Sequence, residues 1–131
     1  MTERTALRTK IYLVDEAKSR SMGPGPLELL RNIGRLASIN KAAKEMNLSY
    51  AKALNMLNRL EETTGQKVVE RTRGGPSQGG TVLTAFGKRY ILEYERLEQR
   101  ICTLADREYQ KFESRLARKK QSLSTADTSG S

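Results

Sequence analysis

The stretch from Ile39 to Leu60 constrains the fold of this chain more than any other feature, because its pattern is that of two short helices joined by a tight turn. Apolar residues recur at helical spacing on each side of Asn47-Leu48-Ser49. Further along, glycines cluster between residues 74 and 80, and a short apolar run lies on each side of them. This order predicts a helix-turn-helix followed by a β-hairpin wing, an arrangement that lies in a DNA groove.

Both short helices have predictable caps and inward faces. Asn40 is expected to cap the first helix and Ser49 the second, each through its side-chain oxygen. The residues expected to face inward are Ala42, Ala43, Met46, Ala53, Leu57 and Leu60. The outward arc of the second helix then holds Ala51, Lys52, Asn55, Asn58 and Arg59. This arc has no acidic residue before Glu61, which suits a helix lying among phosphates.

The segments before this core predict a strand and a further helix. Lys10–Val14 is apolar, with β-branched and aromatic members, and is expected to be a strand, followed by a polar turn over Asp15–Ser21. A helix should start with Pro26 near its first turn. Its apolar face would consist of Leu29, Leu30, Ile33, Leu36 and Ala37.

The segments after this core predict the wing and one long helix. Gly65 is expected to end the second short helix, and Val68–Val69 and Thr81–Thr84 to be the wing strands. From a cap at Thr84, the long helix should run to about Leu116. The predicted fold is therefore mainly α with a small β-wing: a winged helix-turn-helix with a long C-terminal dimerisation helix. This domain should span 9–117, between disordered segments at 1–8 and 118–131.

Charge and composition favour a polyanionic partner and exclude several classes of function. The 131 residues carry a net charge of +9, and residues 66–90 hold five basic side chains against one acidic side chain. There is no histidine and only one cysteine, Cys102, so no enzyme chemistry, metal site or cofactor is expected. No apolar run is long enough for a membrane span, and no secretory signal opens the chain, so a cytoplasmic protein is expected.

Several motifs between about Ile11 and Ile101 resemble the DNA-binding half of ModE-type molybdate-responsive repressors, which are related there to LysR-type winged helices. The matching pieces are Ser49-Tyr50, Val69-Glu70-Arg71, Gly74-Gly75, Gly79-Gly80, Val82-Leu83-Thr84 and the segment 23–30. The sequence departs from the family at Leu54, where tryptophan is usual, and in a wing with fewer glycines at 76–78. We expect the chain to lack the family's molybdate-binding domains. The resemblance therefore implies a DNA-binding transcriptional regulator and not a molybdate sensor.

The expected site is a duplex-DNA interface on the recognition helix and the wing. Lys52, Asn55 and Arg59 would reach bases or phosphates from the major groove, while Ser49 holds the start of the helix. From the wing, Arg71 and Arg73 would contact phosphates or the minor groove, and Gln78 is assigned to the same surface. Tyr50 has two interpretations: it packs under the turn, or it stacks on a sugar or touches a base.

A stripe on the long helix predicts self-association. Tyr94, Leu97, Ile101 and Leu104 recur at spacings of three and four, and one small domain has no second layer to cover them. We therefore expect a homodimer, with no small-molecule site in the chain. The alternative is a winged-helix protein-interaction module that binds its partner through the long helix. A nucleotide-binding loop is disfavoured, because the glycines lie between two strands and not before a helix.

Overall fold

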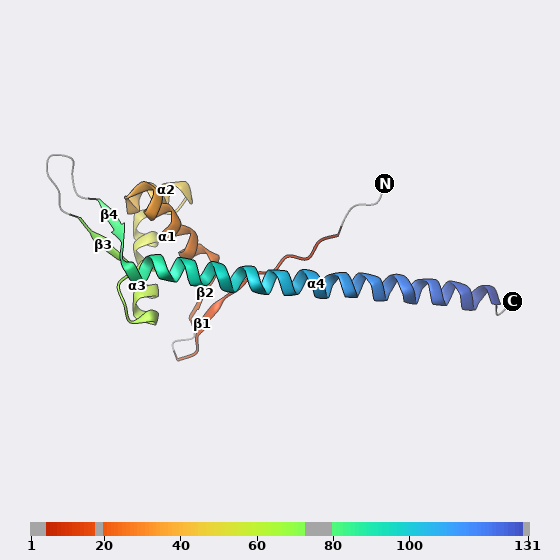
Figure 1. Cartoon of the computed structure of the whole chain (residues 1–131). Coiled ribbons are helices and arrows are strands. Elements are labelled where there is room, and N and C mark those ends of the chain that lie inside the picture. The colour runs from red at the N-terminus through yellow and green to blue at the C-terminus, as the bar shows by residue number, and fades with distance from the viewer. Residues whose placement is uncertain (1–4, 18–19, 73–79, 130–131) are drawn as a thin grey trace. The chain divides into compact units, whose positions relative to one another are not determined.

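The computed structural model describes residues 5–17, 20–72 and 80–129, which form two compact units. One unit is Lys10–Arg96, and the other combines the residues up to Thr9 with those from Leu97 onward. The elements are β1 (Leu13–Asp15), β2 (Arg20–Met22), α1 (Pro24–Leu36), α2 (Ile39–Glu45), α3 (Tyr50–Thr64), β3 (Val69–Arg71), β4 (Thr81–Leu83) and α4 (Ala85–Ser129). Figure 1 shows α1, α2 and α3 grouped with the wing strands around the first turns of α4.

The N-terminal segment is a hairpin, in which β1 pairs antiparallel with β2 and Leu13 lies opposite Met22. The sequence predicts one strand over Lys10–Val14 and a turn over Asp15–Ser21. This prediction is right about a strand at Leu13–Val14 but misses β2, whose Arg-Ser-Met sequence carries no hydrophobic alternation. The proline-rich segment then starts α1, with Pro24 at its first turn and Gly23 as its N-cap.

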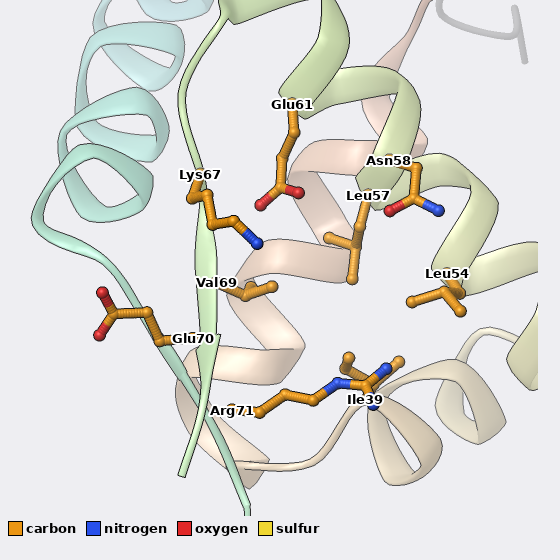
Figure 2. Close-up of a pocket in the computed structure, with 9 residues that line it drawn as sticks. All are labelled: Ile39, Leu54, Leu57, Asn58, Glu61, Lys67, Val69, Glu70 and Arg71. Carbon is orange, nitrogen blue, oxygen red and sulfur yellow. The ribbon is translucent and has the colours of Figure 1, made fainter.

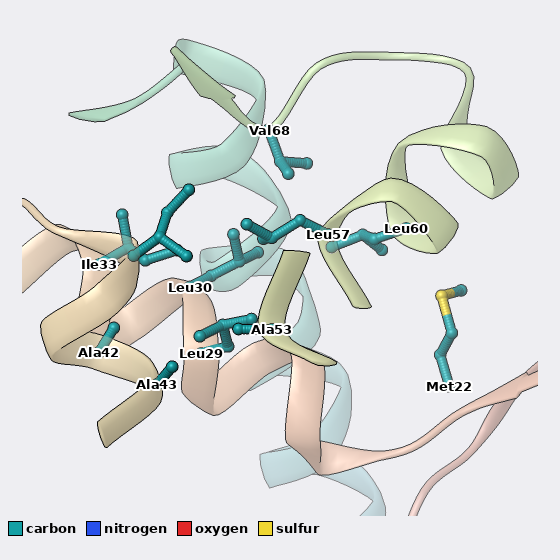
Figure 3. Packing of buried hydrophobic residues seen from close by; sticks show 11 residues of the cluster. Met22, Leu29, Leu30, Ile33, Ala42, Ala43, Ala53, Leu57, Leu60 and Val68 are labelled. Carbon is teal, nitrogen blue, oxygen red and sulfur yellow. The ribbon is translucent and has the colours of Figure 1, made fainter. Parts of the chain in front are cut away.

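The core is built from the inward faces of α1, α2 and α3 (Figure 3). Its largest fully buried side chains are Leu27, Leu29, Leu30, Ile33, Leu57, Leu60 and Val68. Burial of each leucine or isoleucine contributes about 1.5–3 kcal/mol, so these contacts determine how the helices pack. Ala42, Ala43 and Ala53 are also fully buried, and their small side chains let the helices approach closely. The predicted inward faces of α2 and α3 are confirmed, with Met46 partly buried at the core's edge.

Two details of the first helices differ from the prediction. Ala37 does not continue the apolar face of α1: it is exposed and ends the helix with a left-handed φ of 56°. The prediction that Asn40 caps α2 is wrong, because Ser38 Oγ accepts the Lys41 N–H at 3.1 Å and the helix begins at Ile39. Serine and asparagine both cap well, and the extended backbone at Ser38 decides between them.

Helix α4 contributes its first three turns to the Lys10–Arg96 unit. Phe86, Tyr90 and Ile91 pack against the core, and Tyr94 donates a hydrogen bond from its hydroxyl to the Ile11 carbonyl at 2.9 Å. Burial, with the neighbouring Tyr94 as a smaller cause, raises the pKa of Tyr90 to about 12, so this phenol stays neutral. The predicted cap is confirmed, because Thr84 Oγ1 accepts the Gly87 N–H at 2.9 Å.

Helix α4 is longer than the sequence predicts. The sequence predicts a helix that ends near Leu116 and disorder over 118–131. In the structure the helical backbone continues to Ser129. Between Gly87 and Gly130 the chain contains neither glycine nor proline, and arginine, lysine, glutamine and leucine are good helix formers. A polar sequence therefore does not imply an irregular backbone here.

Candidate nucleic-acid interface

The recognition helix α3 begins with a well-formed cap. Ser49 has an extended backbone, and its Oγ accepts the Lys52 N–H at 3.1 Å. The preceding Asn47 has a left-handed φ of 56°, a conformation that asparagine tolerates better than most residues. At the other end Gly65, with φ 72°, donates its N–H to the Glu61 carbonyl. The predicted start and end of this helix are both confirmed.

The outward arc of α3 is polar and free of acid over its first turns. Ala53, Leu57 and Leu60 are buried, and this fixes the rotation of the helix about its axis. All five residues predicted for the opposite arc are exposed: Ala51, Lys52, Asn55, Asn58 and Arg59. The helix therefore presents amide and cationic donors to solvent, the groups that bind base edges and phosphates.

Tyr50 and Arg71 lie together beside the start of α3. The tyrosine side chain is 42% exposed, which favours the second of its two interpretations, a contact with a sugar or a base. Arg71 Nη2 donates a hydrogen bond to Tyr50 Oη at 2.9 Å, which connects the wing strand β3 to the recognition helix. Figure 2 shows the Arg71 side chain reaching from β3 toward Ile39 at the start of α2.

The base of the wing is held by backbone hydrogen bonds. β3 pairs antiparallel with β4, and the Thr72 N–H donates to the Gly80 carbonyl at 2.8 Å. The Thr81 N–H donates to the Ala37 carbonyl at 3.0 Å, which anchors β4 to the end of α1. Arg73 and Gln78, both predicted to contact DNA, lie outside the described residues. The structure therefore places Arg71 alone among the predicted wing contacts.

A pocket of about 510 Å³ separates the C-terminal half of α3 from β3. Leu57, Asn58, Glu61 and Lys67 are among its lining residues, and Figure 2 shows the Glu61 carboxylate and the Lys67 amine pointing into the same space. Glu61 Oε2 accepts the Val68 N–H at 2.8 Å, so this carboxylate fixes the strand that carries Arg71. The sequence does not reveal this role, because there Glu61 is only the first acid on the outward arc.

The stripe predicted for dimerisation is only partly exposed. Tyr94 is 4% exposed and belongs to the core of its own unit, so the prediction that it lines a dimer interface is wrong. The other three residues are exposed on α4: Leu97, Ile101 and Leu104. Phe112 and Leu116 are exposed farther along the same helix. Cys102, on the same helix, is half-buried, and its Sγ lies 3.0 Å from Thr9 Oγ1.

The described residues contain no group of three or more acidic, cysteine or histidine side chains that could hold a metal ion. Within the same part of the chain, no helix is both long and apolar enough to cross a membrane.

A known family matches the middle part of the chain in sequence. Residues 25–88 match the family described as "Bacterial regulatory helix-turn-helix protein, lysR family". The match starts in α1 and ends in the first turn of α4, so it includes the whole helix-turn-helix and both wing strands.

Several curated proteins are similar to this chain in sequence. The "DNA-binding transcriptional dual regulator ModE" of Escherichia coli K12 is 37% identical over 76 residues, covering 58% of this chain and 29% of the relative. The "Molybdenum transport protein ModE" of Azotobacter vinelandii is 37% identical over 81 residues, 62% of this chain and 30% of the relative. The "Molybdenum-pterin-binding protein MopB" of Rhodobacter capsulatus is 35% identical over 92 residues, which cover 70% of this chain and 34% of the relative. The chain thus matches about a third of each relative's length.

A solved structure with the same fold is that of the DNA-binding domain of CbnR in a complex with DNA. Its TM-score is 0.53 at 22% identity, and the match covers 66% of this chain and 93% of that chain. This likeness shows the winged helix-turn-helix fold, as the sequence predicts.

Proposed function

We propose that this protein is a sequence-specific DNA-binding transcriptional regulator of the ModE type. The observation that carries this proposal is the outward arc of α3, which is polar and without acid at its start and lies beside Arg71 in a LysR-type domain. The Escherichia coli relative is named a DNA-binding transcriptional regulator, which supports the same function here. Because only about a third of the relatives is matched, nothing about molybdate is transferred to this chain.

In the proposed complex α3 lies in the major groove of duplex DNA. Lys52, Asn55 and Arg59 face base edges and phosphates, and Ser49 holds the helix start. The wing adds phosphate or minor-groove contacts through Arg71, Arg73 and Gln78. Tyr50, exposed at the start of α3, belongs to the same surface.

The proposed assembly is a homodimer formed through α4. Leu97, Ile101 and Leu104 form an exposed apolar stripe, and a twofold partner would cover it with the same stripe. Two recognition helices in such a dimer would bind half-sites separated by about 34 Å, one turn of B-DNA, or a multiple of that distance.

Salt dependence of duplex binding tests the function. The logarithm of the affinity should fall with the logarithm of salt concentration with a slope near −0.9 per neutralised phosphate, or about −5 if a dimer neutralises six. Changing Arg71 and Arg73 together to alanine should flatten this slope and weaken binding to all sequences alike. The measurement is fluorescence anisotropy on a labelled duplex at several salt concentrations.

The matched control removes two positive charges elsewhere. Arg96 and Arg107 are exposed on α4, and their joint change to alanine should leave the slope nearly unchanged. If the parent protein does not bind duplex DNA, or binds with an affinity independent of salt, the proposed function is wrong. The exposed stripe on α4 would then favour the protein-interaction module.

A further inference from the structure

Tyr50 and Arg71 form a contact between two elements that are separate in the sequence. Tyr50 is the first residue of α3 and Arg71 is the last of β3, yet Nη2 of the arginine lies 2.9 Å from the phenol oxygen. Both side chains are exposed. A hydrogen bond on an exposed surface contributes little stability by itself, so its main effect is on where the guanidinium lies.

The guanidinium retains unused binding capacity in this position. Arginine carries five N–H donors, and the bond to Tyr50 uses one of them. Arg71 forms no ion pair with a carboxylate within the described ranges, where such pairs do occur for Arg31, Arg35 and Arg96. The guanidinium therefore offers several further donors and a positive charge at one point.

The pair lines an open pocket of about 620 Å³ between the helix-turn-helix and the wing. Ser38, Asn40 and Thr72 also line it, so its polar walls come from the segments around α2, α3 and β3. No acidic side chain is among the described residues that line this pocket. A concave polar site with one cation and several hydroxyl and amide groups suits a phosphate oxygen better than a base edge, since a phosphodiester is anionic and accepts only.

We propose that Tyr50 is a positioning residue that holds Arg71 on one backbone phosphate of duplex DNA, at the junction of the recognition helix and the wing. The inference rests on the proposed function and makes it specific. Arg71 is thereby assigned to a phosphate and not to the minor groove, because its guanidinium is held toward α3 and Ile39 (Figure 2). Arg73 and Gln78 remain the residues proposed for the wing's other contacts.

A double-mutant cycle tests this coupling on a duplex recovered by selection from a random DNA library. Removal of the phenol hydroxyl in Tyr50→Phe should weaken binding about fivefold, the effect of one hydrogen bond. Arg71→Ala should weaken binding at least about tenfold, because this change removes a charge-assisted hydrogen bond to the phosphate. The double variant should be no weaker than Arg71→Ala alone, since Tyr50 acts through the arginine.

A set of duplexes, each with one phosphate replaced by a neutral methylphosphonate, locates the phosphate that Arg71 binds. In the parent protein one position should carry an affinity penalty that is absent in Arg71→Ala and reduced in Tyr50→Phe. The salt slope of Arg71→Ala should be shallower by about 0.9 for each phosphate that the variant no longer neutralises. If Tyr50 only supported the fold, Tyr50→Phe would leave the methylphosphonate penalty at that position unchanged.

Two controls match the chemistry of the substitutions. Tyr12→Phe removes the hydroxyl of a tyrosine that precedes α1 in the sequence and is 53% exposed, and it should not change affinity. Arg96→Ala removes an exposed arginine of α4 and should leave the methylphosphonate pattern unchanged. Thermal unfolding of every variant should match the parent within a few degrees.

Additive effects in the cycle, or a phosphate penalty that is the same in Tyr50→Phe and the parent, would overturn the positioning role. A Tyr50→Phe variant that melts well below the parent would do the same, because the tyrosine would then support the fold. In each of these cases parent binding to the selected duplex stands, so the proposed function survives. Failure of the parent to bind duplex DNA at all would reject both.

Discussion

Gly87 shows how a single residue determines the junction between the wing and α4. A Cβ atom built on this glycine would lie 2.3 Å from the Val68 carbonyl oxygen, a distance that real Cβ atoms do not reach. The same carbonyl accepts the Thr84 N–H at 3.0 Å, so the strand cannot move away without breaking this bond. Glycine is therefore required for close approach here, although it is costly within a helix.

Gly87→Ala should lower the free energy of unfolding by about 1–3 kcal/mol, as overpacking does. Gly25→Ala is the matched control, because its added Cβ would meet only the flexible end of Met56 at 3.1 Å. That control should be close to neutral, since the better helix propensity of alanine is offset by the steric restriction on a residue that precedes Pro26. Urea unfolding followed by circular dichroism measures the free energy of unfolding of both variants. Equal stability of the two variants would contradict the close contact at Gly87.

At the level of single residues, three of the four predicted helix caps and ends are right, although Ser38 and not Asn40 caps α2, and the long-range contacts are not predictable. Ser49, Gly65 and Thr84 can be identified because caps depend on residues within one turn. The bond between Tyr50 and Arg71 joins residues 21 positions apart, and no periodicity in the sequence indicates it. Tyr94 fits the stripe by spacing alone, but its hydroxyl bonds the Ile11 carbonyl inside the domain.

At the level of elements, the rotation of α3 decides which side chains would face DNA in the proposed complex. The buried face of α3 is fixed by Ala53, Leu57 and Leu60. Asn55 therefore lies on the exposed face. The sequence is sufficient for this element, because a helix with one clear apolar face has only one rotation that buries it. It is insufficient for β2, which is three residues long and lacks any apolar alternation.

Asn55→Ala tests the assignment of this face. An asparagine amide bonds adenine in a bidentate manner, so its removal should cost about 1–3 kcal/mol at one base pair and relax the preference there. Thermal stability should change little, because the side chain is exposed. Binding to a panel of duplexes with single base changes is the measurement. Gln99→Ala, which removes an exposed amide from α4, is the control and should leave the preference intact.

A protein that unfolds on the Asn55→Ala change while keeping its base preference would show that the face is assigned wrongly. A variant with uniformly weaker binding and unchanged preference would place Asn55 on a phosphate and not on a base. Either result would leave the fold as described and change only the proposed role of this side chain.

At the scale of the whole molecule, charge and apolar surface occur in different parts of the sequence. The excess of basic side chains is densest over residues 66–90, where five basic residues accompany one acidic residue. The exposed apolar stripe of α4 begins at Leu97, beyond the Lys10–Arg96 unit. This division fits the proposed function, with one segment for DNA and another for a partner copy.

Ile101→Glu tests the proposed assembly. Leu97, Ile101 and Leu104 form a stripe on α4, and covering it contributes about 25 cal/mol for each Å² of apolar surface removed from water. A carboxylate at its centre would have to give up its hydration on pairing, which is strongly unfavourable. The variant should therefore be monomeric at micromolar concentrations in light scattering, where the parent should be a dimer.

Dissociation of the dimer should also weaken DNA binding, because two linked recognition helices bind a palindromic site far more tightly than one, by about 10²–10⁴-fold. Gln99→Glu introduces the same charge on the opposite side of the helix and should change neither assembly nor affinity. A parent protein that is monomeric would reject dimerisation through this stripe. If instead Ile101→Glu stays dimeric, the interface must lie elsewhere, and the hairpin of β1 and β2, with Val14 59% exposed, is the next surface to mutate.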